Sequence, residues 1–278
     1  MLKRETELEI KRFSARIHME TVKTIAKLGS GHLGGSLSVA DLLAVLYHSV
    51  MRYDPENPRW EGRDWLVCSK GHAGPAVYSA LALKGFMPLE ELSTLNAPYT
   101  NLPSHCDRFR TKGIDMTTGS LGQGASTAAG IALAHKLKGM SNRVYLIMGD
   151  GELNEGQVWE MALFANHRKL DNMTAFVDCN KLQIDGRTDD ICDLGDIAGK
   201  FREFGWHSKY ADGHDVADIY NAIEEAKATP GAPSVIVLHT VKGHGWGAVE
   251  NTAGSHSLSV SSEQLKEILE EMEKRFAV

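Results

Sequence analysis

The chain has 278 residues, of which 42% are hydrophobic and 24% charged, and its net charge is -6. This is an ordinary globular composition with enough length for a large core, and the absence of a lysine- and arginine-rich block argues against a nucleic-acid partner. The charged N-terminus has no apolar signal core and no stretch reaches the roughly 18 apolar residues of a membrane span, so we expect a cytoplasmic protein with four reduced cysteines.

The first part of the chain predicts two helices. Apolar residues recur at helical spacing from about Thr6 to Leu28, where Gly29 ends the pattern, and again from Val39 to about Met51. With no internal repeat and no linker rich in proline or serine, we interpret residues 1–278 as one domain.

Short β-prone segments follow, with helical patterns between them. They cover residues 64–69, 143–149, 173–179, 205–210 and 234–241. Almost continuously apolar strands that alternate with amphipathic helices are typical of an α/β fold, in which helices cover both faces of a parallel sheet. Ligands of such sheets bind at the carboxyl ends of the strands.

Two of these strands end in oxygen-bearing side chains. Asp150, between two glycines, follows the strand at 143–149, and Asn180 follows the strand at 173–179. Carboxylate and amide oxygens suit Mg²⁺ or Ca²⁺, which often complete their coordination with water and a ligand phosphate. An isolated Gly-Asp-Gly is more often a turn in which the aspartate caps the next helix.

The longer pattern resembles a known family. Gly-Asp-Gly, followed after about thirty residues by Asn-Lys, is similar to the diphosphate-binding motif of thiamine-diphosphate enzymes. Further loops match transketolase in order and approximate spacing: SGHLGGSLSVADLL (30–43), CSKGHAGPAVYSALALKGF (68–86), GIDMTTGSLGQGAS (113–126), GDGELNEGQVWEM (149–161), NKLQIDG (180–186) and AGSHS (253–257). The chain is therefore identified as the N-terminal, thiamine-diphosphate-binding part of a transketolase, with that family's fold.

The resemblance implies roles for individual residues. Asp150, Asn180 and the carbonyl of Leu182 match the ligands of a divalent metal, which would be Mg²⁺, Ca²⁺ or Mn²⁺. His32, His105 and His256 match catalytic histidines that bind the hydroxyls of a ketose and assist proton movement. The residues that match the binding site of thiamine diphosphate are Lys70, His72, Gly119, Ser120, Leu121, Gly151, Asn180, Ile184, Lys242 and His256.

The resemblance also implies the reaction, which is transfer of a two-carbon ketol unit from a ketose phosphate to an aldose phosphate, as in the pentose phosphate pathway. Where the family usually has Gly-His-Pro, this chain has Ser104, His105 and Cys106, followed by the basic residues Arg108, Arg110 and Lys112. This departure leaves the sugar specificity open. The alternative to the pentose phosphate role is a transketolase for an unusual sugar, such as a sulfonated or branched ketose. Another alternative is the N-terminal half of a different thiamine enzyme, such as 1-deoxyxylulose-phosphate synthase.

The activating glutamate of these enzymes lies in a pyrimidine-binding domain. After AGSHS the chain has only an amphipathic helix with a capping pair, Ser261 and Gln264. We therefore expect a separately encoded C-terminal subunit, with two copies of each subunit in the active enzyme. Other classes fit less well, because GSLGQG has the wrong spacing for a nicotinamide dehydrogenase and no P-loop is present. A non-catalytic subunit remains an alternative.

Overall fold

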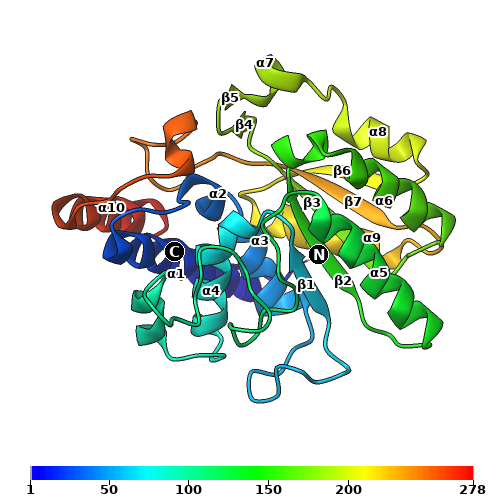
Figure 1. Cartoon of the computed structure of the whole chain (residues 1–278), viewed down its shortest axis with the longest axis horizontal. Helices are drawn as coiled ribbons and strands as arrows, with labels where there is room; N and C mark the ends of the chain where they lie inside the picture. Colours follow the sequence, from blue (N-terminus) through cyan, green and yellow to red (C-terminus); the bar gives the residue numbers. More distant parts are fainter. Residues whose placement is uncertain (1, 278) are drawn as a thin grey trace.

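The computed structural model describes residues 2–277 and contains a five-stranded sheet (Figure 1). In spatial order its strands are β1 (Trp65–Cys68), β2 (Val144–Gly149), β3 (Met173–Cys179), β7 (Ser234–His239) and β6 (His207–Asp212). Every neighbouring pair is parallel. All five strands coincide with predicted segments to within two residues, and the predicted α/β fold class is confirmed.

Helices cover both faces of the sheet (Figure 1). One core contains residues of α1 (Arg4–Leu28), α3 (Ala40–Val45), α4 (Gly74–Leu83) and α9 (Val216–Ala228), and the other contains residues of α5 (Gln123–Leu137), α6 (Gly156–His167) and α8 (Ile197–Glu203). Successive side chains of β2 alternate between the two cores, because a strand presents them to opposite faces. This two-sided burial explains why the strands are almost continuously apolar.

The second predicted helix is divided. α3 ends at Val45, and Leu46–Val50 form a π-helical turn, η1. The hydroxyl of Tyr53 donates to the carbonyl of Tyr47 at 2.6 Å, and the amide of Met51 donates instead to the carbonyl of Leu46 at 2.8 Å. At this wider turn the carbonyl of Tyr47 thus accepts from the side chain of a residue beyond the helix, and the amide of Met51 bonds one residue further back.

Short elements complete the chain. They are α2 (Gly34–Leu37), η2 (Gly71–Ala73), η3 (Leu89–Thr94), η4 (Gly151–Asn154), the hairpin β4 (Leu182–Gln183) and β5 (Gly186–Arg187), α7 (Thr188–Cys192), and η5 (Ala253–His256). The last helix, α10 (Ser262–Arg275), begins with the predicted capping box of Ser261 and Gln264 and packs against α1. No helix within residues 2–277 is long and apolar enough to cross a membrane.

The parallel sheet brings the ends of four strands to one edge. Ser69 follows β1, Asp150 follows β2, Asn180 follows β3 and Thr240 follows β7. The loops at this edge approach closely, since a Cβ atom on Gly71 would lie 2.7 Å from the backbone nitrogen of Gly119. Glycine at this position lets the loop after β1 meet the loop that precedes α5.

Candidate functional site

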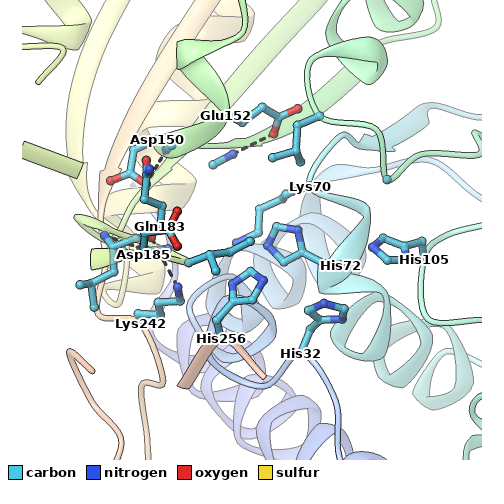
Figure 2. A pocket seen from close by; sticks show the side chains of 18 residues that line it. His32, Lys70, His72, His105, Asp150, Glu152, Gln183, Asp185, Lys242 and His256 are labelled. Carbon is cyan, nitrogen blue, oxygen red and sulfur yellow. Dashed lines mark hydrogen bonds between the residues drawn. The ribbon is translucent and has the colours of Figure 1, made fainter. Parts of the chain in front are cut away.

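A cavity of about 340 Å³ opens at this edge of the sheet (Figure 2). Its walls come from the loops after β1, β2, β3 and β7, the segments before α2 and α5, and η5. The lining residues are His32, Gly35, Lys70, His72, His105, Gly119, Leu121, Gly149, Asp150, Gly151, Glu152, Asn180, Leu182, Gln183, Ile184, Asp185, Lys242 and His256. Its volume lies within the range of small-molecule sites.

The cavity contains the three predicted metal ligands. Asp150 accepts hydrogen bonds from the amides of Lys181 at 2.7 Å and Gly151 at 2.9 Å. Burial, together with the charge of Asp178, raises the pKa of Asp150 to about 6. The amide nitrogen of Asn180 donates to Asp178 at 2.9 Å, which fixes the orientation of its side chain. Asp150, Asn180 and Leu182 thus line one cavity, and a carboxylate, a side-chain amide oxygen and a backbone carbonyl would make an all-oxygen set suited to a hard cation.

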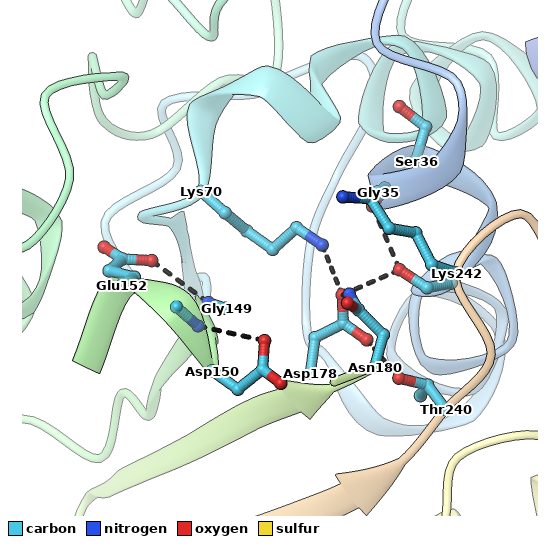
Figure 3. Close-up of polar contacts among 12 residues, drawn as sticks. Gly35, Ser36, Lys70, Gly149, Asp150, Glu152, Asp178, Asn180, Thr240 and Lys242 are labelled. Atoms are coloured by element: carbon cyan, nitrogen blue, oxygen red, sulfur yellow. Dashed lines mark hydrogen bonds and ion pairs between the residues drawn. The ribbon is translucent and has the colours of Figure 1, made fainter. Parts of the chain in front are cut away.

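A buried ion pair supports this wall of the cavity (Figure 3). The ammonium of Lys70 donates to the carboxylate of Asp178, and both side chains are almost fully buried. Asp178 also accepts from Ser38 at 2.7 Å and from the hydroxyl of Thr240. Burial alone would raise the pKa of Asp178, but the charge and hydrogen bond of Lys70 hold it below its usual value. Asp178 is therefore an anion that keeps Lys70 extended beneath the cavity.

A second buried carboxylate, Glu152, joins three loops. It accepts from the hydroxyl of Ser69, from the amide of Gly122 at 2.8 Å and from the amide of Gly149 at 3.1 Å. These partners lie after β1, before α5 and at the end of β2. Glu152 consequently fixes the relative positions of three loops that line the cavity.

Lys242 carries a positive charge, and no carboxylate among residues 2–277 forms an ion pair with it. Its side chain is 2% exposed, and its ammonium lies 3.5 Å from the carbonyl oxygen of Leu182. Burial, with the nearby charge of Lys70, lowers the pKa of Lys242 to about 8. A buried ammonium in a cavity is unfavourable unless an anion completes its surroundings, so this wall is suited to a negatively charged ligand.

Four histidines converge on the other side of the cavity (Figure 2). The ring centre of His32 lies 5.6 Å from that of His72, 5.4 Å from that of His105 and 5.2 Å from that of His256. His72 and His256 are 5.2 Å apart. The four rings come from separate loops and surround one volume, where they can contact several groups of a polar ligand.

The electrostatics of the cavity keep these imidazoles neutral. Burial lowers the pKa of all four, and in His72 the charge of Lys70 adds to this effect. Burial and the charge of Lys242 lower the pKa of His256 to about 4. Each ring can therefore act as a donor through one nitrogen and as an acceptor through the other at neutral pH.

The structure brings together every predicted site residue except Ser120, which is exposed and does not line the cavity. Ile184 is 67% exposed and lies in the wall formed by the β4–β5 hairpin. The basic residues Arg108, Arg110 and Lys112 line a different hollow, of about 220 Å³. They do not line the histidine cavity.

Sequence reasoning missed Asp178, Glu152, Gln183 and Asp185. A signal existed for Asp178, because it is a carboxylate inside an apolar strand and lies two residues before Asn180. For Glu152 the sequence carries no comparable signal, since its three partners are brought together only by the fold.

Comparison with known protein families gives one match that covers almost the whole chain. Residues 10–276 match the family described as "Transketolase, thiamine diphosphate binding domain". The match includes every residue that lines the cavity.

Curated relatives include subunits of two sugar-specific enzymes. The chain is 50% identical to 6-deoxy-6-sulfo-D-fructose transketolase subunit SqwG of Clostridium sp. (strain MSTE9), over 98% of this chain and 99% of that protein. It is 35% identical to a subunit of the apulose-4-phosphate transketolase of Phocaeicola vulgatus, over 91% of this chain and 90% of that protein.

Solved structures of similar proteins are longer. The structure of transketolase from Pichia stipitis in complex with sedoheptulose 7-phosphate has a TM-score of 0.90 and 30% identity to this chain. The alignment covers 97% of this chain but 41% of that protein. This chain therefore spans less than half the length of the solved transketolase that it resembles.

Proposed function

We propose that this chain, which belongs to the family of transketolase thiamine-diphosphate-binding domains, is the N-terminal subunit of a two-subunit transketolase. In this proposal residues 1–278 form one domain, which binds thiamine diphosphate and a divalent metal, preferably Mg²⁺. The observation that carries the proposal is the single cavity in which the predicted cofactor, metal and substrate residues meet. The rival classes, 1-deoxyxylulose-phosphate synthase and a non-catalytic subunit, have no comparable support.

The donor chemistry of the cavity fits the cofactor. Among the described residues, Lys242 offers a buried ammonium without a carboxylate partner, as an anionic diphosphate requires. Asp150, Asn180 and the carbonyl of Leu182 would hold a divalent metal, which would help to neutralise the charge of this diphosphate. Burial raises the pKa of the Asp150 carboxyl group. A cation beside Asp150 would offset this effect by stabilising the carboxylate. Both features of the cavity thus favour a metal-diphosphate pair.

When bound, thiamine diphosphate supplies the carbanion and the electron sink for cleavage between the second and third carbons of a ketose. The protein contributes orientation and proton handling. The neutral rings of His32, His105 and His256 would bind the hydroxyl groups of the sugar and accept or return the proton of the hydroxyl next to the cleaved bond. Lys70, held by Asp178, would stay beneath the cofactor instead of competing for the sugar.

For the donor substrate we propose a ketose with a terminal sulfonate, such as 6-deoxy-6-sulfofructose. The support is the 50% identity to the Clostridium protein, whose name gives this sugar, compared with 36% identity to Escherichia coli transketolase 1. The pentose phosphate role inferred from the sequence becomes the second choice. The departure from Gly-His-Pro around His105 agrees with an altered sugar site.

The active enzyme in this proposal contains a separate C-terminal subunit, with two copies of each. The names of the relatives from Clostridium and Phocaeicola, both of nearly this length, include the word subunit. A cytoplasmic enzyme is proposed because all four cysteines are unpaired, as a reducing compartment would keep them.

A coupled assay tests both the reaction and the substrate. The chain is mixed with the product of a neighbouring gene that encodes a C-terminal transketolase subunit, in the presence of thiamine diphosphate and Mg²⁺. Donors are 6-deoxy-6-sulfofructose, fructose 6-phosphate and xylulose 5-phosphate. We expect turnover only with both subunits, and the highest kcat/KM with the sulfonate. A higher value with a sugar phosphate would contradict the substrate, and turnover by the chain alone would contradict the two-subunit enzyme.

A further inference from the structure

A second group of metal-binding side chains lies away from the cavity. His18 of α1, Asp41 of α3 and His244, which follows β7, each place one donor atom within 4.8 Å of the others. None of the three lines the cofactor cavity. We propose that these residues form a binding site for Zn²⁺ that stabilises the structure.

The hydrogen bonds of His18 leave one nitrogen free. Nδ1 lies 3.0 Å from the carbonyl oxygen of Ser14, so it carries the proton and donates to that oxygen. Nε2 is then a lone-pair donor, and it is buried without a hydrogen-bond partner anywhere in residues 2–277. An imidazole that ligates a metal through one nitrogen commonly donates its other N–H to a backbone carbonyl. A buried nitrogen without a partner is unfavourable unless something binds it.

Hydrogen bonds also fix the orientation of the Asp41 side chain. Its Oδ1 accepts from the hydroxyl of Ser14 at 2.5 Å, and its Oδ2 accepts from Nδ1 of His214 at 2.8 Å. Nε2 of His214 accepts from the amide of Val241 at 2.8 Å, so both nitrogens of His214 are occupied. His214 is therefore a supporting residue that holds the carboxylate, and it stacks on His244 with 3.6 Å between ring centres.

His244 completes the set. Its Nδ1 lies 3.4 Å from a guanidinium nitrogen of Arg275 and 3.5 Å from a carboxylate oxygen of Glu250. A guanidinium only donates, so without metal Nδ1 accepts from Arg275 and Nε2 carries the proton. Zn²⁺ would bind Nε2 of the other neutral tautomer, in which Nδ1 carries the proton and faces Glu250. Burial lowers the pKa of both imidazoles, that of His244 to about 3, so both rings are neutral at pH 7. Burial alone would raise the pKa of Asp41, but the hydrogen bond from His214 and the nearby His18 hold it below its usual value. His18 and Asp41 are therefore in the protonation states that a metal requires, and His244 reaches its own by moving one proton from Nε2 to Nδ1.

The geometry is close to that of tetrahedral zinc. The ring centres of His18 and His244 are 5.7 Å apart, and two imidazoles on one tetrahedral Zn²⁺ have centres roughly 5 Å apart. Zn²⁺ binding would bring the donor atoms, which lie within 4.8 Å of one another, to about 3.4 Å. Two nitrogens and one carboxylate oxygen leave one position for water, and this donor set favours Zn²⁺ over Mg²⁺.

The site would connect distant parts of the chain. It joins α1 and α3 to the segment after β7, in which Lys242 lies two residues before His244. Phe276, just after α10, covers His18 with 4.6 Å between ring centres. Bound Zn²⁺ would therefore hold the segment that presents Lys242 to the cofactor cavity.

The experiment uses the full chain and Zn²⁺ alone. Protein stripped with a chelator is titrated with Zn²⁺ by calorimetry, without thiamine diphosphate and with excess Mg²⁺ to occupy the oxygen site at Asp150. We expect one equivalent of Zn²⁺ to bind. His244→Ala and His18→Gln should each weaken binding by at least about 100-fold, whereas His167→Ala, an exposed histidine of α6, should not change it.

X-ray absorption at the zinc edge of the loaded wild-type protein gives a test that needs no variant. We expect a first shell that includes two imidazole nitrogens. A shell of oxygens alone, no binding to the wild-type chain, or unchanged binding by His244→Ala would overturn the proposal. If His18→Gln fails to fold, the His244→Ala titration and the absorption spectrum decide, because His244 is partly exposed and tolerates truncation better.

Discussion

At the scale of single residues, Asp150 is the most direct test of the cofactor site. Asp150→Ala removes a carboxylate from a turn, and the core packing of β2 and β3 does not depend on it. We expect metal-dependent binding of thiamine diphosphate to fall at least about 100-fold, because a metal ligand is lost. Calorimetry with and without Mg²⁺ measures this change.

The matched control for that variant is Asp190→Ala, which removes an exposed carboxylate of α7. It should bind the cofactor as the wild type does. Tight, metal-dependent binding by Asp150→Ala would show that the metal is held elsewhere.

The histidines of the cavity separate into two predicted roles. His32→Ala should lower kcat/KM for the ketose without changing the affinity for thiamine diphosphate, since His32 is assigned to the sugar. His72→Ala should weaken cofactor binding as well, because His72 lies beside Lys70 beneath the predicted diphosphate. Steady-state kinetics and calorimetry on the reconstituted enzyme measure both effects. Equal loss of cofactor affinity in the two variants would show that the roles are divided wrongly.

Asp115 gives a prediction about pH and stability. Burial raises the pKa of Asp115 from 3.8 to about 6, and the guanidinium of Arg63, 2.9 Å away, offsets only part of this effect. The folded protein thus holds this proton more tightly than the unfolded chain. The contribution of this bound proton to the free energy of unfolding is greatest below pH 3.8 and is lost as the pH rises through 6.

A pKa difference of this size corresponds to about 3 kcal/mol in the free energy of unfolding. Between about pH 4 and pH 7 the wild type should therefore lose roughly 2 kcal/mol that Asp115→Asn does not lose. Urea denaturation across this range, with the exposed Asp190→Asn as control, measures the difference. Parallel pH profiles for the wild type and Asp115→Asn would refute the raised pKa.

At the scale of elements, the capping box of α10 stabilises a helix that packs on α1. The hydroxyl of Ser261 accepts from the amide of Gln264 at 3.2 Å, and the side chain of Gln264 accepts from the amide of Ser261 at 2.9 Å. Ser261→Ala should lower the free energy of unfolding by about 1 kcal/mol, the usual cost of losing such a cap. Urea denaturation tests this, with the exposed Ser259→Ala as control; an effect equal to that of the control would mean that α10 does not unfold with the rest of the molecule.

Helices and strands could be predicted from the sequence where the local residue pattern and the tertiary contacts favour the same structure. The strands were predicted because burial on both faces demands uninterrupted apolar residues, and the start of α10 because capping is local. The π-helical turn at Leu46–Val50 was not predicted, and it occurs where the hydroxyl of Tyr53, a residue beyond the helix, donates to the carbonyl of Tyr47. In the candidate site, Asp150 and Asn180 follow strands and could be placed at one edge. The bridge through Glu152 and the contacts around His18 depend on residues that only the fold brings together.

At the scale of the whole molecule, the sheet gathers loops from distant parts of the sequence at one edge, while both faces are closed by helices (Figure 1). The cavity lies at this edge, where a second protein chain could cover a bound ligand. The Pichia transketolase contains more than twice the aligned length, and so it has protein that could occupy this position. Under the proposed two-subunit arrangement, we expect the affinity for the cofactor to depend on both subunits.

The last prediction follows from that arrangement. Thiamine diphosphate with Mg²⁺ should bind at least about tenfold more tightly to the mixture of this chain and its C-terminal partner than to the chain alone. The reason is that a second wall buries more of the ligand and keeps water from Lys242 and Asp150. Calorimetry on the separate subunits and on the mixture measures the difference, and the Asp150→Ala chain in the same mixture is the control. Equal affinity for the chain alone and for the mixture would mean that the cofactor does not lie between two subunits. Since obligate interfaces often exceed about 2,000 Å², sedimentation should also detect the complex at micromolar concentrations.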